Sequence, residues 1–447
     1  MPSLENPVHP PDLIIAARWI IPVEPANLVL EDHALVVRGG RIAAIMPREA
    51  AEEAFPSASL LERPTHVLLP GLVNAHTHAG MTLLRGFADD LPLETWLHDH
   101  VWPTEARWIS PSFVRDGTNL ALLEMLQGGT TTFADMYHHP DVVAAAVADS
   151  GMRAAIGMIV LEAPTPWARD AAECLSKGLA LHDQFKGHPR ISMMFAPHSP
   201  YAVADATFEQ VRILADELDV PVQMHLHETA AEIDTAVERN GRRPLQRLVD
   251  LGMVTPLLAA VHMTQLTTDE IGLLADRGAL VIHCPESNLK LASGFCPVTR
   301  LAGAGVRLAL GTDGAASNND LDMFSEMRTA ALVAKGVMAD AGVLPAAATL
   351  RMGTLGGAEA LGLGDRIGSL EPGKEADLIC VDLARPATQP VHSPISQLVY
   401  ATSRDQVTDS WIAGQHLLAD GKPVHLDSGA ILARAAAWAV KFGRGDG

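Results

Sequence analysis

The sequence of 447 residues contains little cysteine and no long apolar run. The four cysteines are scattered along the chain and form no CxxC motif: Cys174, Cys284, Cys296 and Cys380. Isolated cysteines of this kind are typical of reduced thiols, so we expect a cytoplasmic protein. A helix that crosses a membrane needs about 18 consecutive apolar residues, and because the chain has no such run, no spanning helix is expected.

Positive charge is also scarce. Lys and Arg total 33 against 53 Asp and Glu, which gives a formal net charge of -20. Most of such a surface would repel nucleic acids and anionic membranes, so neither is an expected partner. Residues 1–12 lack the basic start of a secretory signal, and we expect none. Hydrophobic residues make up 48% of the chain, enough for a large core beside a smaller domain.

Both ends of the chain contain short β-rich runs that are separated by glycine turns. These runs are residues 13–15, 34–37, 42–45, 376–381, 407–412 and 416–418. Because the two ends share this pattern, we predict one small β-sandwich domain that is assembled from residues 1–69 and 365–447.

The middle of the chain alternates strand and helix patterns. Eight strands are expected, centred on Leu72–Ala75, Thr131–Ala134, Ala154–Met158, Ser192–Ala196, Val222–His225, Leu258–His262, Ala279–His283 and Arg307–Leu310. Helical stretches such as 207–218 and 268–277 lie between them. Eight such units predict an α/β fold with a (β/α)8 TIM-type barrel over residues 70–364. A doubly wound open sheet is the alternative, since the order of the strands is not visible in a sequence.

Residues that can bind metal or exchange protons gather at the ends of these strands, where a closed barrel carries its chemistry. His76 and His78 end the first strand two residues apart, so both side chains point to the same face. His225 ends the fifth strand and Asp313 follows the eighth. These four residues predict a site for one divalent ion. Zinc suits such N and O ligands and keeps a position open for water, and ferrous iron would also accept them.

Two further residues are candidates for proton transfer beside this ion. Glu228 follows His225 by three residues, so its carboxyl can act without binding the metal; the alternative is a solvated glutamate at a helix start. His262 ends the sixth strand and is either a group that orients the attacking water or a core histidine. We expect a structural role for His283, and surface or lid positions for the histidines of the loops: His98, His100, His138 and His139.

Four segments resemble the amidohydrolase superfamily. They are PGLVNAHTH (70–78), HLHE (225–228), HCPESNLKLASG (283–294) and GTDGAASNN (311–319). Within the superfamily the chain is similar to the 5-methylthioadenosine/S-adenosylhomocysteine deaminases. The resemblance covers nearly the whole chain, including SLEPGKEADLICVD (369–382) in the two-ended β domain. Its metal motifs are specific to the superfamily and much less specific for the substrate.

The resemblance implies a role for each matching residue. His76, His78, His225 and Asp313 would bind the metal, and Asp313 would also take a proton from the attacking water. Glu228 would protonate N1 of an adenine ring attacked at C6, and His262 would orient the hydroxide. Contacts with the substrate would come from Glu105 at the ribose, His198 at the purine and Ser317 near the metal. Arg153 and Arg169 are candidates for binding a homocysteine carboxylate.

The expected function is therefore the hydrolytic deamination of adenosine-type nucleosides, in a protein that forms homo-oligomers. Guanine or pterin deaminases and triazine chlorohydrolases share this metal site and remain alternatives. A two-metal amidase needs a lysine at the end of the fourth strand, where the chain has Ala196, Pro197 and His198. The deaminases with HxE and PCxxC motifs are excluded because CxxC is absent. A non-catalytic relative is a remote alternative, since none of the metal ligands is missing.

Overall fold

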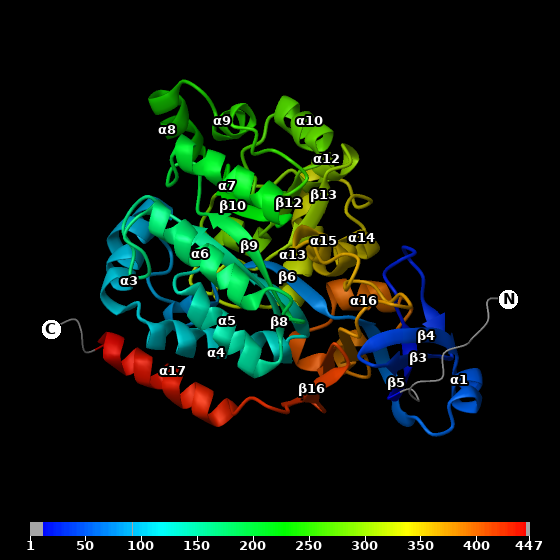
Figure 1. Ribbon diagram of the computed structural model, residues 1–447. Coiled ribbons are helices and arrows are strands. Elements are labelled where there is room, and N and C mark those ends of the chain that lie inside the picture. Colours follow the sequence, from blue (N-terminus) through cyan, green and yellow to red (C-terminus); the bar gives the residue numbers. More distant parts are fainter. Residues whose placement is uncertain (1–11, 92, 444–447) are drawn as a thin grey trace.

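The computed structural model describes residues 12–91 and 93–443. The signal-peptide expectation concerns residues 1–11 in particular, which lie outside the described residues. Two sheets organise the fold, a parallel barrel and a mixed sheet beside it (Figure 1). Within the described residues, no helix is long and apolar enough to cross a bilayer.

The barrel contains eight parallel strands, each paired with the next along the chain. They are β6 (Leu72–Thr77), β7 (Thr130–Asp135), β8 (Arg153–Val160), β9 (Ile191–Pro197), β10 (Val222–Leu226), β11 (Leu258–His262), β12 (Leu280–His283) and β13 (Arg307–Leu310). Nearly every residue of these strands is buried, as expected where helices cover a sheet that is packed on both faces. The predicted (β/α)8 barrel is confirmed.

The first and last strands of the barrel meet through hydrogen bonds of side chains and of the main chain. Asn74 donates to the Thr312 hydroxyl (2.8 Å) and accepts from the Thr312 N–H (3.0 Å), and the Asp313 N–H donates to the His76 carbonyl (3.0 Å). A Cβ at Gly311 would lie 2.7 Å from the His76 nitrogen, so only glycine permits this approach. The seam therefore brings Asp313 beside the histidines of β6.

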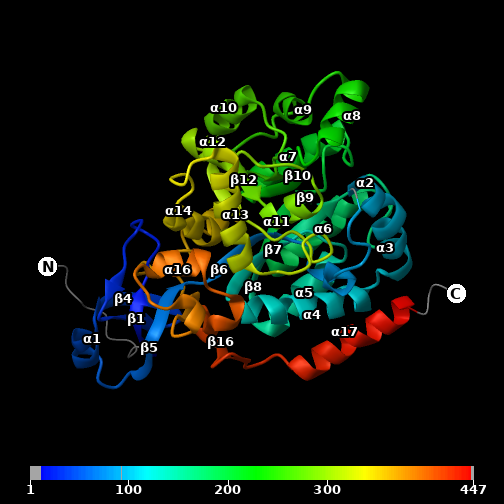
Figure 2. The ribbon, with the colours of Figure 1, turned by 180° about the vertical axis from the view of Figure 1, so that it is seen from behind.

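Helices pack against the barrel (Figures 1 and 2). They are α4 (Pro111–Gln127), α5 (Pro140–Ser150), α6 (Ala171–Phe185), α7 (Asp205–Leu218), α8 (Ala230–Asn240), α9 (Pro244–Asp250), α10 (Thr268–Arg277), α11 (Pro285–Lys290), α12 (Val298–Gly303), α13 (Met323–Met338), α14 (Ala346–Arg351), η3 (Met352–Gly356) and α15 (Gly357–Ala360). The bounds of α10 follow from its caps, a Thr267–Glu270 capping box at the start and Gly278 at the end.

A long excursion between β6 and α4 lies over the C-terminal end of the barrel. It contains η1 (Ala79–Leu84), α2 (Leu93–Thr95), η2 (Trp96–Val101) and α3 (Trp102–Trp108). Trp96 and Val101 are buried in the barrel core cluster. The excursion thus forms one wall over the strand ends that carry the candidate metal ligands.

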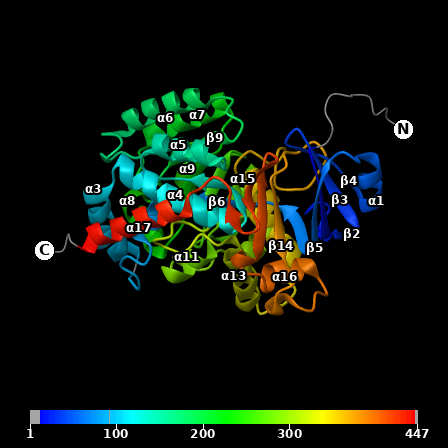
Figure 3. The ribbon, with the colours of Figure 1, turned by 90° about the horizontal axis from the view of Figure 1, so that it is seen from below.

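The second sheet has nine strands from both ends of the chain. They are β1 (Leu13–Ile20), β2 (Leu30–Glu31), β3 (His33–Arg38), β4 (Arg41–Pro47), β5 (Ser59–Pro70), β14 (Leu378–Asp382), β15 (Val407–Ile412), β16 (Gln415–Ala419) and β17 (Lys422–Pro423). The two halves join where β5 pairs with β14 in antiparallel register (Figure 3). Ile15 and Leu35 share one buried cluster with Leu378 and Trp411, so the predicted β domain from both chain ends is confirmed.

The remaining helices are α1 (Arg48–Ala54), η4 (Pro386–Thr388), α16 (Pro394–Tyr400), η5 (Arg404–Gln406) and α17 (Ser428–Gly443). Helix α17 leaves the mixed sheet and runs along α4 of the barrel (Figure 3). The Trp438 indole N–H donates to Asp116 at 2.9 Å, and Arg434 forms an ion pair with the same carboxylate. The exact domain limits 1–69, 70–364 and 365–447 stay a prediction.

Candidate active site

Four side chains from β6, β10 and the end of β13 converge at the C-terminal end of the barrel. One ligand atom from each of His76, His78, His225 and Asp313 lies within 4.8 Å of the others. The His225 Nε2 is 3.2 Å from that of His76 and 3.3 Å from that of His78. Asp313 Oδ1 lies 3.1 Å from His78 Nε2 and 3.5 Å from His76 Nε2. These are the four residues that the strand ends predicted.

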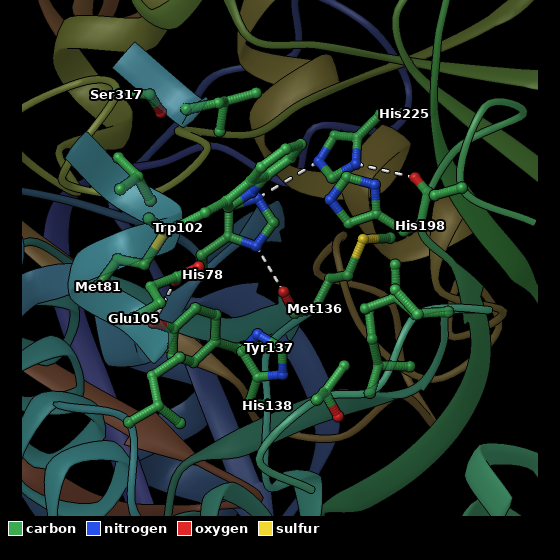
Figure 4. A pocket seen from close by; sticks show the side chains of 18 of the residues that line it. His78, Met81, Trp102, Glu105, Met136, Tyr137, His138, His198, His225 and Ser317 are labelled. Atoms are coloured by element: carbon green, nitrogen blue, oxygen red, sulfur yellow. Dashed lines mark hydrogen bonds between the residues drawn. The ribbon is translucent and has the colours of Figure 1, made fainter. Parts of the chain in front are cut away.

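Each histidine of this cluster has its other ring nitrogen held by an acceptor. The Nδ1 of His76 donates to Gln223 Oε1 at 2.7 Å. The Nδ1 atoms of His78 and His225 donate to the carbonyl of Met136 and, at 2.9 Å, to that of His198 (Figure 4). Carbonyl oxygens only accept, so the Nδ1 atoms carry the protons and the three Nε2 lone pairs face the centre. Such a fixed tautomer is what metal-binding histidines require.

Asp313 is held by two hydroxyls. Ser287 and Ser317 each donate to Oδ2 at 2.7 Å, which leaves Oδ1 beside the histidines. Burial would raise the pKa of Asp313, but the neighbouring His76 and His78 hold it well below its usual range. Burial would lower the pKa of His78, but the Asp313 carboxylate raises it to about 9, so a cation beside Nε2, either a proton or a metal ion, is favoured. The cluster therefore favours positive charge between these side chains, and three nitrogens with one carboxylate oxygen fit one divalent metal ion.

A cavity of about 510 Å³ opens onto this cluster. Residues from the β6–α4 excursion, the end of β7 and the segment after β8 form its walls (Figure 4). His76 is deeply buried, but every other predicted site residue lines the cavity. These residues are His78, Glu105, His198, His225, Glu228, His262, Asp313 and Ser317. The structure thus brings together residues that are spread over more than two hundred positions of the chain.

Glu228 and His262 lie next to each other in this cavity. His262 Nε2 is 3.7 Å from Glu228 Oε2, and His262 Nδ1 contacts Asn288 Oδ1 at 2.9 Å. Burial, helped by the negative charge of Asp313, raises the pKa of Glu228 to about 8. Burial also lowers the pKa of His262, which favours a neutral ring. A carboxyl with a pKa in this range can both give and take a proton near neutral pH.

Glu105 and His198 occupy other parts of the wall. The Tyr137 hydroxyl donates to Glu105 Oε1 at 2.6 Å, and burial raises the pKa of Glu105 to about 7 although this hydrogen bond opposes the rise. The His198 ring lies 4.7 Å from the His225 ring. Burial lowers the pKa of His198 to about 3, so the ring is neutral and can hydrogen bond to an uncharged base.

A model of the amidohydrolase family matches residues 67–417, which include the whole barrel and the four clustered ligands. The chain belongs to the amidohydrolase family.

Individual relatives are similar to this amidohydrolase over nearly its whole length. A 5-methylthioadenosine/S-adenosylhomocysteine deaminase from Teredinibacter turnerae is 48% identical over 97% of this chain and 98% of its own. The crystal structure of an adenosine deaminase from Xanthomonas campestris with bound zinc has 55% identity and a TM-score of 0.96, covering 97% of this chain and 99% of that one. Atrazine chlorohydrolase from Arthrobacter aurescens, complexed with zinc, has 25% identity and a TM-score of 0.89, over 95% of this chain and 99% of that one.

The structure also adds residues to the site of this amidohydrolase that the sequence analysis did not single out. Gln223 could have been predicted from the sequence, because it lies two residues before His225 on β10 and must point to the same face of the strand. Ser287 and Asn288 follow β12 and reach the site only through the fold. His138, expected in a surface or lid position, instead lines the cavity after β7. Ser317, which the sequence analysis did name, lines the cavity as well, and its hydroxyl donates a hydrogen bond to Asp313.

Proposed function

We propose that this amidohydrolase uses one zinc ion to deaminate adenosine-type nucleosides, giving the inosine analogue and ammonia. The observation that carries the proposal is the presence, in one cavity, of the His76, His78, His225 and Asp313 cluster together with Glu228 and Glu105. The relatives named as deaminases, and the zinc bound to one of them, support it.

The reaction needs a nucleophile, a proton donor for the ring and an anchor for the nucleoside. A divalent ion held by the four ligands would supply Lewis acidity and lower the pKa of a bound water to about 7. Asp313 takes the proton of the attacking water, and Glu228 delivers a proton to N1 of the adenine ring as C6 is attacked. The proton then moves to the amine, the C6–N bond breaks, and ammonia leaves. A neutral His262 that donates from Nδ1 to Asn288 keeps an Nε2 lone pair, which accepts a hydrogen bond from the attacking water and orients it.

The test is release of ammonia from a panel of adenosine, 5′-deoxyadenosine, methylthioadenosine, S-adenosylhomocysteine and guanine, with the zinc-loaded protein. We expect the adenosine analogues to react and guanine to be inert. Zinc-loaded protein that releases ammonia from none of the adenosine analogues would overturn the proposal. Turnover of guanine alone would replace it with the purine-base alternative.

Among the 5′ substituents, we predict a preference for an uncharged group. The walls from η2, α3 and the segment after β8 are apolar: Trp96, Leu97, Trp102, Leu161, Pro164 and Pro166. The described lining contains no lysine or arginine, and its carboxyl groups are those of Glu105, Glu228 and Asp313. Burying a carboxylate there is costly, so kcat/KM for methylthioadenosine should exceed that for S-adenosylhomocysteine by about 10-fold or more.

The two candidate arginines do not change this expectation. Arg153 begins β8, at the opposite end of the barrel from the site, and is buried in ion pairs with Glu375 and Asp377. Arg169 is exposed and paired with Asp170 and Glu173. Arg169→Ala should therefore leave the ratio of the two kcat/KM values unchanged. If this variant lost S-adenosylhomocysteine turnover selectively, Arg169 would bind the carboxylate and the predicted preference would be wrong.

A homo-oligomeric state, a cytoplasmic location and the lack of a nucleic-acid partner stay predictions from the sequence. Size-exclusion chromatography coupled to light scattering tests the first of these directly.

A further inference from the structure

We propose that Tyr137 is a positioning residue for the sugar: it holds one oxygen of Glu105 and leaves the other for the two ribose hydroxyls. This inference rests on the proposed function, because it assigns Glu105 to the ribose. Its own content is the dependence of Glu105 on Tyr137.

The contact joins two elements that are distant in the sequence. Tyr137 follows β7, Glu105 lies on α3, and both line the cavity. The Tyr137 hydroxyl donates to Glu105 Oε1 at 2.6 Å. Among the described residues, the Glu105 carboxylate has no other side-chain hydrogen bond. One carboxylate oxygen is therefore occupied, and the other remains for substrate. A carboxylate only accepts, and the two ribose hydroxyls can donate to it.

The Tyr137 ring is held in place by close packing. A Cβ on Gly80 would lie 2.6 Å from two carbons of the ring, so the glycine makes room for it. The ring centroid lies 6.4 Å from that of His78, and only 5% of the residue is exposed. A ring packed this tightly holds its hydroxyl at one point in the cavity wall, which a free side chain could not do.

The same short segment also holds a metal ligand. The carbonyl of Met136, next to Tyr137, accepts from Nδ1 of His78 (Figure 4). Met136 and Tyr137 therefore fix the position of a metal ligand and the position of the sugar carboxylate at the same time. The distance between Glu105 and the metal cluster is thus fixed. A nucleoside whose ribose is bound at Glu105 then has its C6 held at the metal cluster, where the reaction occurs.

The hydrogen bond from Tyr137 also favours the negatively charged form of Glu105, which is the form that accepts hydrogen bonds from hydroxyls. Burial raises the pKa of Glu105 to about 7, and the Tyr137 hydroxyl counteracts this rise because it donates to the ionised carboxylate. Burial and the neighbouring Glu105 raise the pKa of Tyr137 well above its ordinary value, so the phenol keeps its proton. Tyr137 therefore acts as a permanent donor that favours Glu105 as an acceptor for hydroxyls.

The experiment is Tyr137→Phe, which removes one oxygen and keeps the ring. For methylthioadenosine we expect KM to rise about 10-fold with kcat changed less than about threefold, since a charge-assisted hydrogen bond supports binding rather than chemistry. For 2′,3′-dideoxyadenosine, scored as substrate or as competitive inhibitor, no change is expected because the hydroxyls are missing. In a Glu105→Gln background, Tyr137→Phe should add little, since the two residues act as a unit.

Tyr201→Phe is the matched control, because Tyr201 also lines the cavity and is not bonded to Glu105. It should leave the ratio between the ribose and dideoxyribose compounds unchanged. The inference is overturned if Tyr137→Phe weakens both compounds equally, or if its effect adds fully to that of Glu105→Gln. A parent enzyme that deaminates no adenosine analogue would instead contradict the proposed function.

Discussion

Replacement of His225 by alanine is expected to remove the metal ion and the activity together. His225 is the ligand that β10 contributes, and its Nε2 lies 3.2–3.3 Å from those of His76 and His78. Without it, two nitrogens and one carboxylate remain, and the water loses the cation that makes it acidic at neutral pH. Bound zinc should fall from about one ion per chain to a small fraction after dialysis, and turnover should fall by about 10³-fold or more.

Elemental analysis and the ammonia assay on the same sample give both quantities. His392→Ala, which removes an exposed histidine, is the control and should keep metal and turnover. A His225→Ala protein that is folded by circular dichroism and still holds a full equivalent of zinc would contradict the assignment of His225 as a ligand. Two ions per chain in the parent protein would contradict the single-metal site.

The barrel could be predicted because its strands are short apolar runs that end in polar residues. All eight predicted centres lie within or at the observed strands, from β6 to β13.

Strand β5 of the mixed sheet was missed because Pro64 lies inside it, and proline normally argues against a strand. The structure accommodates Pro64 at the point where the register between β1 and β5 shifts. The pattern of hydrophobic residues does not reveal such a register shift, so a sequence cannot show that the strand tolerates the proline.

The four clustered ligands could also be predicted, because closure of a barrel brings the ends of distant strands together. The groups that orient these ligands and His262 could not be predicted, with one exception. Ser287 and Asn288 lie on α11, and their distance to Asp313 and His262 depends on how that short helix packs after β12. Gln223 is the exception, since the alternation of β10 places it on the same face as His225.

The segment after β7 contains site residues that the sequence analysis did not predict. The residues after the predicted strand at 131–134 include Met136 and Tyr137, which are apolar or aromatic and gave no sign of a functional strand end. The structure shows that the backbone and side chains of this segment serve the site, through the Met136 carbonyl and the Tyr137 hydroxyl. A backbone carbonyl that orients a metal ligand leaves no trace in residue type, so only coordinates reveal it.

Glu228→Gln is expected to retain the metal and lose most of the turnover. Glutamine has nearly the same shape as glutamate and can still hydrogen bond to a ring nitrogen, yet it cannot deliver a proton to N1. Glu228 lies beside His262 with 12% of its side chain exposed, and it is not one of the four clustered ligands. General acid–base groups contribute about 10²–10⁴-fold, so kcat should fall within or beyond that range while zinc content is unchanged. KM should change much less, because the amide fills the same space against the purine.

The control is Glu238→Gln, which makes the same chemical change on the exposed face of helix α8 and should leave kcat unaltered. Initial rates with methylthioadenosine and metal analysis of the same samples separate the two explanations of a loss. Loss of zinc in Glu228→Gln would mean that Glu228 supports the metal rather than the proton transfer. Near-normal kcat with zinc retained would transfer the role of proton donor to His262, which lies beside Glu228, or to water.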